Sequence, residues 1–338
     1  MRNRIITRDG AFSGVTAIII SIALAASASS TLGGVTGEVL IVDGSDSETC
    51  RRVGERLTEV VNALETGHLE SVRGDFTQAG YEAGTALLAK VRIENAEFTH
   101  RTRILQRPAE HLLEVRDIHV RVAMEGTRGD PNQFMVFRLT QDALLIEDML
   151  FSVEAWHYRE LIEKGRDLKD LPLRQRIVNF LEIFRTAYNR KDLSYLNKVY
   201  SDDALIIVGR VLQQKPEGEK VSEMLHHTKW NSKRIEFLRL SKEEYLGRLA
   251  NIFQQNAFVR VEFDSIRIEQ RENFPQLYGV NVKQRWYSST YADTGYVFLM
   301  MDFETPEEPL IRVRCWQPEP FDDGSLPSVR DFIVVGKQ

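Results

Sequence analysis

The chain has 338 residues, of which 43% are hydrophobic and 28% charged, and its formal net charge is -5. This composition is typical of globular proteins, and the length suggests about two domains. The acidic balance argues against a nucleic-acid surface, so we predict no nucleic-acid partner.

The N-terminal residues differ in character from the rest. Three arginines among the first eight residues precede the apolar run VTAIIISIALAA (15–26), which small residues follow. This order is typical of a secretory signal, and the run is shorter than the ~20 residues that a membrane-spanning helix needs. We predict a signal peptide over 1–28, a linker over 29–48, and export to a bacterial periplasm or the cell exterior. An uncleaved anchor is the alternative, and this segment is the only expected membrane contact.

Residues 49–165 have the pattern of helix followed by strands. Apolar residues from Val53 to Leu64 recur on one helical face. Alternation of apolar and polar residues between 90 and 156 predicts strands. The stretch 72–88 is short and broken by glycine, so we expect no clear third helix there.

Residues 170–338 repeat this order with stronger signals. An apolar stripe over 173–188 predicts a helix, and Asp192 is placed to cap a short second one. The capping-box sequence SKEE (241–244) opens a third helix. Strands fill the remainder, and a slip in their alternation near residue 265 predicts a bulge.

The two halves share one pattern. A shift of 124 residues lays Leu57 on Leu181 and Leu64 on Tyr188, among other apolar positions. Helices that precede antiparallel strands are typical of an α+β fold with the helices on one face of a sheet. We interpret the chain as a tandem duplication whose first copy is degenerate.

The stretch DLSYLNKVYSDDALIIVG (192–209), followed by the helix start at 241, resembles nuclear transport factor 2-like domains, the superfamily of the SnoaL and ketosteroid-isomerase-like cones. The resemblance covers about 170–320 throughout and 49–165 in outline. It implies an α+β chain of two tandem cone-shaped domains, with helices packed on a curved antiparallel sheet. The superfamily includes enzymes and inert binding proteins, so the fold does not choose the function.

Asp202 and Asp203 stand where a helix gives way to a strand. Two adjacent carboxylates suit general acid–base catalysis, but aspartates also turn the chain through hydrogen bonds to the backbone. The resemblance favours the turn.

Asp302 is the candidate base of an enzyme. Ketosteroid-isomerase-like members place a carboxylate and hydroxyl donors inside the cone, and Asp302 ends a strand stripe that contains Tyr296. A buried carboxylate has a raised pKa that suits a base, with Tyr296 or Tyr188 as the donor. The alternative is that Asp302 only ends its strand. No complete catalytic set can be assembled from these residues.

Two strands carry candidate binding residues. Gln284 and Trp286 share one strand face with valines, so Gln284 either meets a ligand or bonds the backbone, and Trp286 is either a pocket wall or core. Arg314 and Trp316 share the polar face of the strand LIRVRCW (310–316). On an exposed sheet face they would dock a partner or pair with acidic neighbours.

No metal and no cofactor are predicted. The pair His226-His227 has no further ligand at a suitable spacing, and dinucleotide, P-loop, zinc-protease and hydrolase motifs do not occur. Cys50 and Cys315 either form a bridge, which export permits, or remain separate thiols, which is the expected case.

These observations favour an exported, non-enzymatic protein that binds a small hydrophobic ligand or a protein partner. The alternative is an isomerase or dehydratase with a carboxylate base in the second cone, and the third hypothesis is a structural scaffold. The two copies are expected to pair as a pseudo-dimer within the chain, or the chain as a homodimer. An open second cone with a polar floor would favour a ligand or a reaction.

Overall fold

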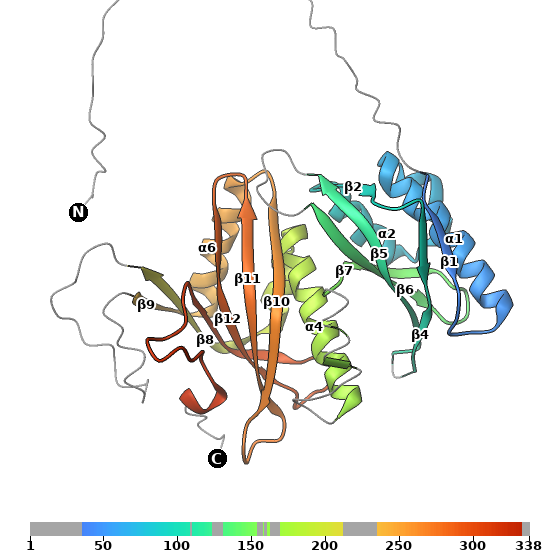
Figure 1. Ribbon diagram of the computed structural model, residues 1–338. Helices are drawn as coiled ribbons and strands as arrows, with labels where there is room; N and C mark the ends of the chain where they lie inside the picture. Colours follow the sequence, from blue (N-terminus) through green and yellow to red (C-terminus); the bar gives the residue numbers. More distant parts are fainter. Residues whose placement is uncertain are drawn as a thin grey trace, which may run out of the picture. The chain divides into compact units, whose positions relative to one another are not determined.

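The computed structural model describes residues 36–108, 110–123, 131–153, 158, 161–162, 170–211 and 235–332 (Figure 1). The expected signal peptide and the pair His226-His227 lie outside the described residues. Within the described part of the chain, no helix is long and apolar enough to span a membrane.

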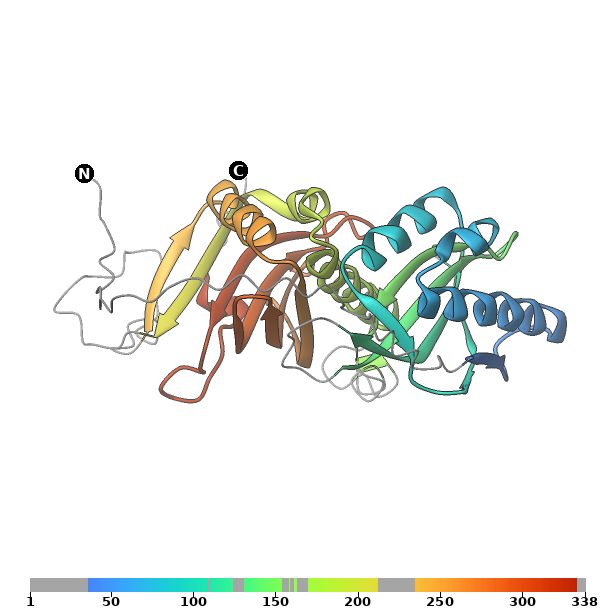
Figure 2. The ribbon, with the colours of Figure 1, turned by 90° about the horizontal axis from the view of Figure 1, so that it is seen from above.

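The first half is a sheet with α1 and α2 packed on one face (Figure 2). The sheet has the order β2-β5-β6-β7, with β4 also paired to β5, and β1 forms a separate parallel pair with β3. In chain order the elements are β1 (Glu38–Ile41), α1 (Ser47–Thr66), η1 (Leu69–Asp75), α2 (Gln78–Leu88), β2 (Arg92–Asn95), β3 (Thr99–Thr102), β4 (Ile104–Arg107), β5 (Leu112–Ala123), β6 (Asn132–Thr140) and β7 (Ile146–Phe151).

Helix α2 corrects the expectation of no clear third helix. Thr77 caps it by accepting a hydrogen bond from the backbone N–H of Gly80. A Cβ at Gly80 would lie 2.1 Å from the carbonyl oxygen of Ile146. The glycines that weaken the helical signal are therefore what allows α2 to approach β7 closely.

The second half follows the element order that the sequence predicts. Its sheet has the order β10-β11-β12-β13-β8-β9, antiparallel except for the pair β13–β8. In chain order the elements are α4 (Leu171–Arg190), α5 (Leu193–Val199), β8 (Tyr200–Val211), β9 (Ile235–Leu240), α6 (Lys242–Gln255), β10 (Val259–Gln270), β11 (Leu277–Ser288), β12 (Ala292–Asp302), β13 (Leu310–Gln317) and η4 (Val329–Asp331).

Local signals in the second half are confirmed. Asp192 caps α5, and Ser241 and Glu244 form a complete capping box at α6. The predicted slip is a break in the β10–β11 register between Asp264 and Arg267. The first half has a shorter counterpart of the parallel β13–β8 pair, because Phe76 and Ile146 form an isolated parallel bridge directly before α2.

Helix α4 lies between the two sheets (Figures 1 and 2). Its buried Glu182 accepts hydrogen bonds from Arg116 of β5 (3.1 Å) and from the backbone N–H of Val153 (2.9 Å). Arg185 donates to the carbonyl oxygens of Ser152 (2.7 Å) and Val261 (2.8 Å). One helix thus anchors both halves, which share the compact unit 34–338.

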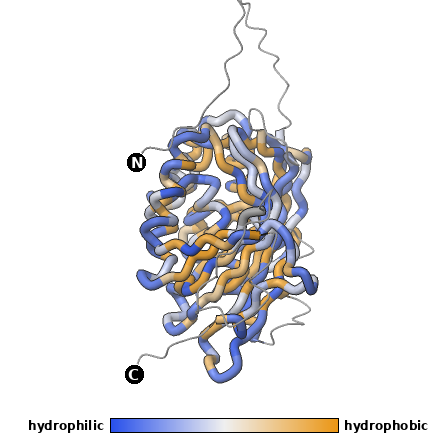
Figure 3. The backbone as a smooth tube through the Cα atoms, turned by 90° about the vertical axis from the view of Figure 1, so that its left-hand side faces the viewer, coloured by the Kyte–Doolittle hydropathy of each residue, from blue (hydrophilic) through white to orange (hydrophobic). Residues whose placement is uncertain are grey.

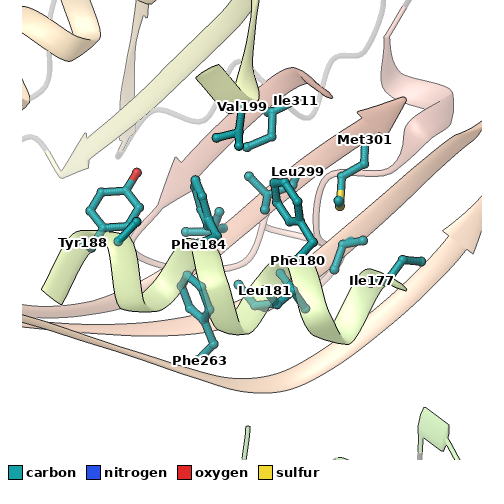
Figure 4. Packing of buried hydrophobic residues seen from close by; sticks show 14 of the residues in the cluster. Ile177, Phe180, Leu181, Phe184, Tyr188, Val199, Phe263, Leu299, Met301 and Ile311 are labelled. Carbon is teal, nitrogen blue, oxygen red and sulfur yellow. The ribbon is translucent and has the colours of Figure 1, made fainter. Parts of the chain in front are cut away.

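The second sheet has a buried inner face and an outer face that is buried around β12 and β13. Its inner face packs on the aromatic and aliphatic stripe of α4, where Phe184 contacts Tyr188 and Phe263 (Figure 4). Its outer face is covered by the segment after β13, where Phe332 stacks on Phe298 with centroids 5.4 Å apart. Apolar stretches accordingly gather along the strands, and polar ones at the loops (Figure 3).

Candidate functional site

A bulge in β13 decides which side chains enter the second core. The register with both neighbouring strands shifts at Arg312. As a result, Ile311 belongs to the inner core, whereas Val313 and Cys315 belong to the outer cluster. By the alternation of a strand, Arg314 and Trp316 then face inward.

This placement corrects the expected exposed stripe. Arg314 is only 6% exposed, and Trp316 packs against the inner core. The expectation assumed that one face of the strand is buried and the other solvated. Here both faces are covered, because the C-terminal segment lies on the outer one.

Arg314 is a buried cation that has no hydrogen-bond or ion-pair partner among the described residues. Its guanidinium carbon lies 5.1 Å from the ring centroid of Tyr245. No hydrogen bond or ion pair joins it to another described residue, and its Nε is buried and unpartnered. Burial alone would lower the pKa of Arg314, but the nearby tyrosines, Tyr245 first, raise it above its usual value, so the side chain stays charged.

Three phenols form a chain beside this arginine. The hydroxyl oxygen of Tyr188 lies 2.6 Å from that of Tyr245 and 3.3 Å from that of Tyr200. Burial raises the pKa of Tyr188 and of Tyr200, so both remain neutral. The structure therefore places Tyr188, the sequence's candidate donor, next to Arg314 in the second core.

Gly295 leaves a position without a side chain on the inner face of the sheet. It pairs with Gln284 across β11–β12, and Trp286 pairs with Asp293 in the adjacent position. A Cβ at Gly295 would lie 2.9 Å from two ring atoms of Trp316, so the indole rests against the bare backbone. Glycine leaves the space that this contact requires.

Two further polar groups here lack partners. The indole Nε1 of Trp316 is buried and makes no hydrogen bond to a described residue. Gln284 is 5% exposed, and its amide has no hydrogen bond to any described residue. The sequence left open whether Gln284 bonds the backbone, and the described residues show no such bond.

Asp293 completes the group, and sequence reasoning missed it. Burial raises its pKa, although a hydrogen bond from Tyr291 and the charge of Arg314 act in the other direction. Its Oδ1 is buried without a partner. In the sequence it lies among turn-like residues, but alternation with Val297 would have placed it on the inner face. We call the following residues the inner-face site: Gln284, Trp286, Asp293, Gly295, Arg314 and Trp316.

Asp302 and Tyr296 do not belong to this site. They alternate with Val297 and Met301 of the inner core, so they fall on the outer face of β12. The Oδ2 of Asp302 accepts from Nε of Arg312 at 3.0 Å, and its Oδ1 accepts from the backbone N–H of Glu304 at 2.9 Å. Asp302, the candidate base, thus lies on the opposite face of the sheet from Tyr188, and its carboxylate is already paired with Arg312.

Asp202 and Asp203 are separate anchors. Asp202 accepts from Nζ of Lys242 at 2.8 Å, and Asp203 accepts from Nη1 of Arg312 at 3.1 Å. Both lie within β8 and pair with different cations, and Asp203 shares Arg312 with Asp302. Cys50 and Cys315 are both free thiols. The described residues contain no cluster of His, Cys, Asp or Glu suited to hold a metal ion.

The sequence matches no protein-family model and no curated protein. Among solved structures, it is similar to an NTF-2-like protein of unknown function from Shewanella oneidensis MR-1, at 16% identity over 42% of this chain and 96% of that one, with a TM-score of 0.29. It is similar to ActVI-ORFA from Streptomyces coelicolor (10% identity, 43% of this chain, 95% of that one, TM-score 0.29). It is also similar to a chain of naphthalene 1,2-dioxygenase (10% identity, 54% of this chain, 95% of that one, TM-score 0.34).

The element order and the helices on the inner face of a mostly antiparallel sheet give the second half an α+β fold. This agrees with the resemblance in the sequence. The fold does not specify a reaction, so function must be argued from the inner-face site.

Proposed function

We propose that the inner-face site binds a small molecule and that the chain is a binding protein. One observation carries this proposal. The Nε of Arg314 and the indole Nε1 of Trp316 are buried without partners among the described residues, and the amide of Gln284 lies on the same sheet face. Buried polar groups without partners are costly, and a bound molecule would supply what they lack.

The alternative of a protein partner at Arg314 and Trp316 has less support. Both side chains face the core side of the sheet, where a second folded protein cannot reach them. The opposite face is occupied by the chain's own C-terminal segment. Aromatic walls with a few convergent polar groups suit a small ligand instead.

The first test uses the neutral fluorescent probe N-phenyl-1-naphthylamine, because it reports an apolar site without assuming a charge. We expect saturable binding at one site per chain. Gly295→Val should weaken binding about tenfold or more, because its Cβ would lie 2.6 Å from the carbonyl oxygen of Gln317 and 2.9 Å from the Trp316 indole. Circular dichroism should show that the variant is folded.

Gly247→Val is the matched control. A Cβ at Gly247 of α6 meets nothing within 4 Å, so this variant should bind the probe like the wild type. Absence of saturable binding, or equal binding by Gly295→Val, would contradict the proposal.

A second candidate is an enzyme whose base is Asp293, because this carboxyl has a raised pKa and lies on the same face as the phenol chain. Such an enzyme should convert a small unconjugated ketone such as 3-cyclohexenone into its conjugated isomer, and Asp293→Asn should abolish turnover. The binding proposal expects no turnover by the wild type.

Export is also a proposal, supported by the N-terminal sequence pattern. Expression of the full chain in a bacterium should yield a periplasmic protein whose N-terminus begins near residue 29. An intact N-terminus on cytoplasmic protein would contradict it.

A further inference from the structure

The inner-face site combines the positive charge of Arg314 with a surface of aromatic side chains. Arg314 contributes a full positive charge, and no ion pair within the described residues balances it directly. The charge of Arg314 lowers the pKa of Asp293, but the hydrogen bond that the Asp293 carboxylate accepts comes from Tyr291. Trp286 and Trp316 pack on the inner core, and the Tyr245 ring centroid lies 5.1 Å from the guanidinium carbon.

We propose that the ligand is an aromatic carboxylate, whose carboxylate binds Arg314 and whose ring lies among the tryptophans. This inference rests on the proposed function and specifies its ligand. The guanidinium carbon of Arg314 lies 5.1 Å from the centroid of the Tyr245 ring, and its Nε has no hydrogen-bond partner among the described residues, so donors remain for an anion. A guanidinium presents those donors in a planar fork that matches a carboxylate.

The surroundings explain why the ligand is an organic acid and not an inorganic anion. Beyond Arg314 and Gln284, the neighbouring inner-face positions are Val282, Val297 and Phe263. A fully hydrated anion such as sulfate gains nothing from these apolar walls. A flat ring buries its own apolar surface against them and against the two indoles.

The test compares three matched probes by isothermal titration of the full chain. 2-Naphthoate carries both the ring and the charge, 2-naphthamide is its neutral counterpart, and decahydro-2-naphthoate keeps the charge without the aromatic ring. We expect 2-naphthoate to bind about tenfold or more tightly than either. In Arg314→Gln the advantage over 2-naphthamide should disappear, while 2-naphthamide binding should change little.

Arg330→Gln is the control, because it removes the same charge from an exposed side chain of the C-terminal segment that pairs with Glu272. It should leave all three affinities unchanged, and circular dichroism should show that both variants fold. Equal binding of 2-naphthoate and 2-naphthamide would show that the ligand need not be an anion. Equal binding of 2-naphthoate and decahydro-2-naphthoate, or displacement of 2-naphthoate by equimolar sulfate, would show that the ligand need not be aromatic. In these cases the small-molecule site would stand. If none of the three probes binds and N-phenyl-1-naphthylamine does not bind either, the proposed function itself fails.

Discussion

Most buried arginines in the described part of the chain bind carboxylates or backbone carbonyl oxygens, and Arg314 binds neither. Arg107 and Arg116 lie against carboxylates, at 2.7 Å and 3.0 Å from Oε1 of Glu114. Arg314 is as deeply buried and has no such neighbour within the described residues. A paired buried charge serves the fold, whereas an unpaired one indicates a site that something else completes.

Glu114 provides a test at this scale. Burial would raise its pKa, but Arg116, Arg107 and Arg138 together lower it to about 2. Because the folded pKa lies below the unfolded one, the stabilisation is complete above about pH 4.5 and is lost as the pH falls toward 2. Glu114→Gln should lower the free energy of unfolding at pH 7 by about 3 kcal/mol.

Urea unfolding at several pH values measures this effect. The difference between wild type and Glu114→Gln should shrink by about 1.4 kcal/mol per pH unit below pH 4.5, because only the wild type titrates. The exposed pair of Glu55 and Arg51 is the control, and Glu55→Gln should change little. A difference that stays constant from pH 7 to pH 3 would contradict the account.

At the scale of elements, sequence patterns predicted what depends on neighbours along the chain. The caps of α5 and α6, the apolar stripe of α4 and the bulge in β10 are of this kind. The bulge at Arg312 could not be predicted in the same way, because LIRVRCW alternates regularly and the shift arises from pairing with β8 and β12. Asp302 was misplaced because its stripe is apolar yet faces the C-terminal segment.

The C-terminal segment is an element whose contacts can be tested. A Cβ at Gly279 would lie 2.6 Å from Cγ1 of Val329, and Asn281 donates to the carbonyl oxygen of Pro327 at 2.9 Å. Beneath the segment lies Cys315, whose thiol has a pKa raised well above the usual value by burial. Gly279→Val should dislodge the segment and expose this thiol.

The rate of Cys315 labelling by a thiol reagent, in a Cys50→Ser background, measures this displacement. We expect negligible labelling in the parent and rapid labelling in Gly279→Val. Gly247→Val is the control and should behave like the parent, because its position is open. Equal protection of Cys315 in all three proteins would show that the segment does not depend on Gly279.

At the scale of the whole molecule, the sequence predicted two related halves but not the way in which they are joined. The repeated helix-then-strand order predicted a duplication, whereas nothing in the sequence singles out Glu182. In the structure, Glu182 and Arg185 bind the first half from a helix whose other side forms the second core. No local pattern marks a polar helix face as buried.

This shared helix predicts that residues 34–338 unfold as one unit. Far-ultraviolet circular dichroism, which reports the helices and strands of both halves, and the fluorescence of the tryptophans, of which Trp286 and Trp316 lie in the second half, should give coincident thermal transitions. Glu182→Ala should lower the midpoint in both signals, because Arg116 loses a buried partner. Two separated transitions in the wild type would show that the halves are independent.

The most direct test of the central claim follows the indole N–H signals of the protein by NMR during titration with 2-naphthoate. The chain has 4 tryptophans, so each signal can be assigned by single Trp→Phe substitutions. We predict that the Nε1–H signal of Trp316, which has no hydrogen-bond partner, moves most, together with the Nε–H signal of Arg314. If those two signals stay fixed while the ligand is in excess, the inner face of the second sheet is not a binding site.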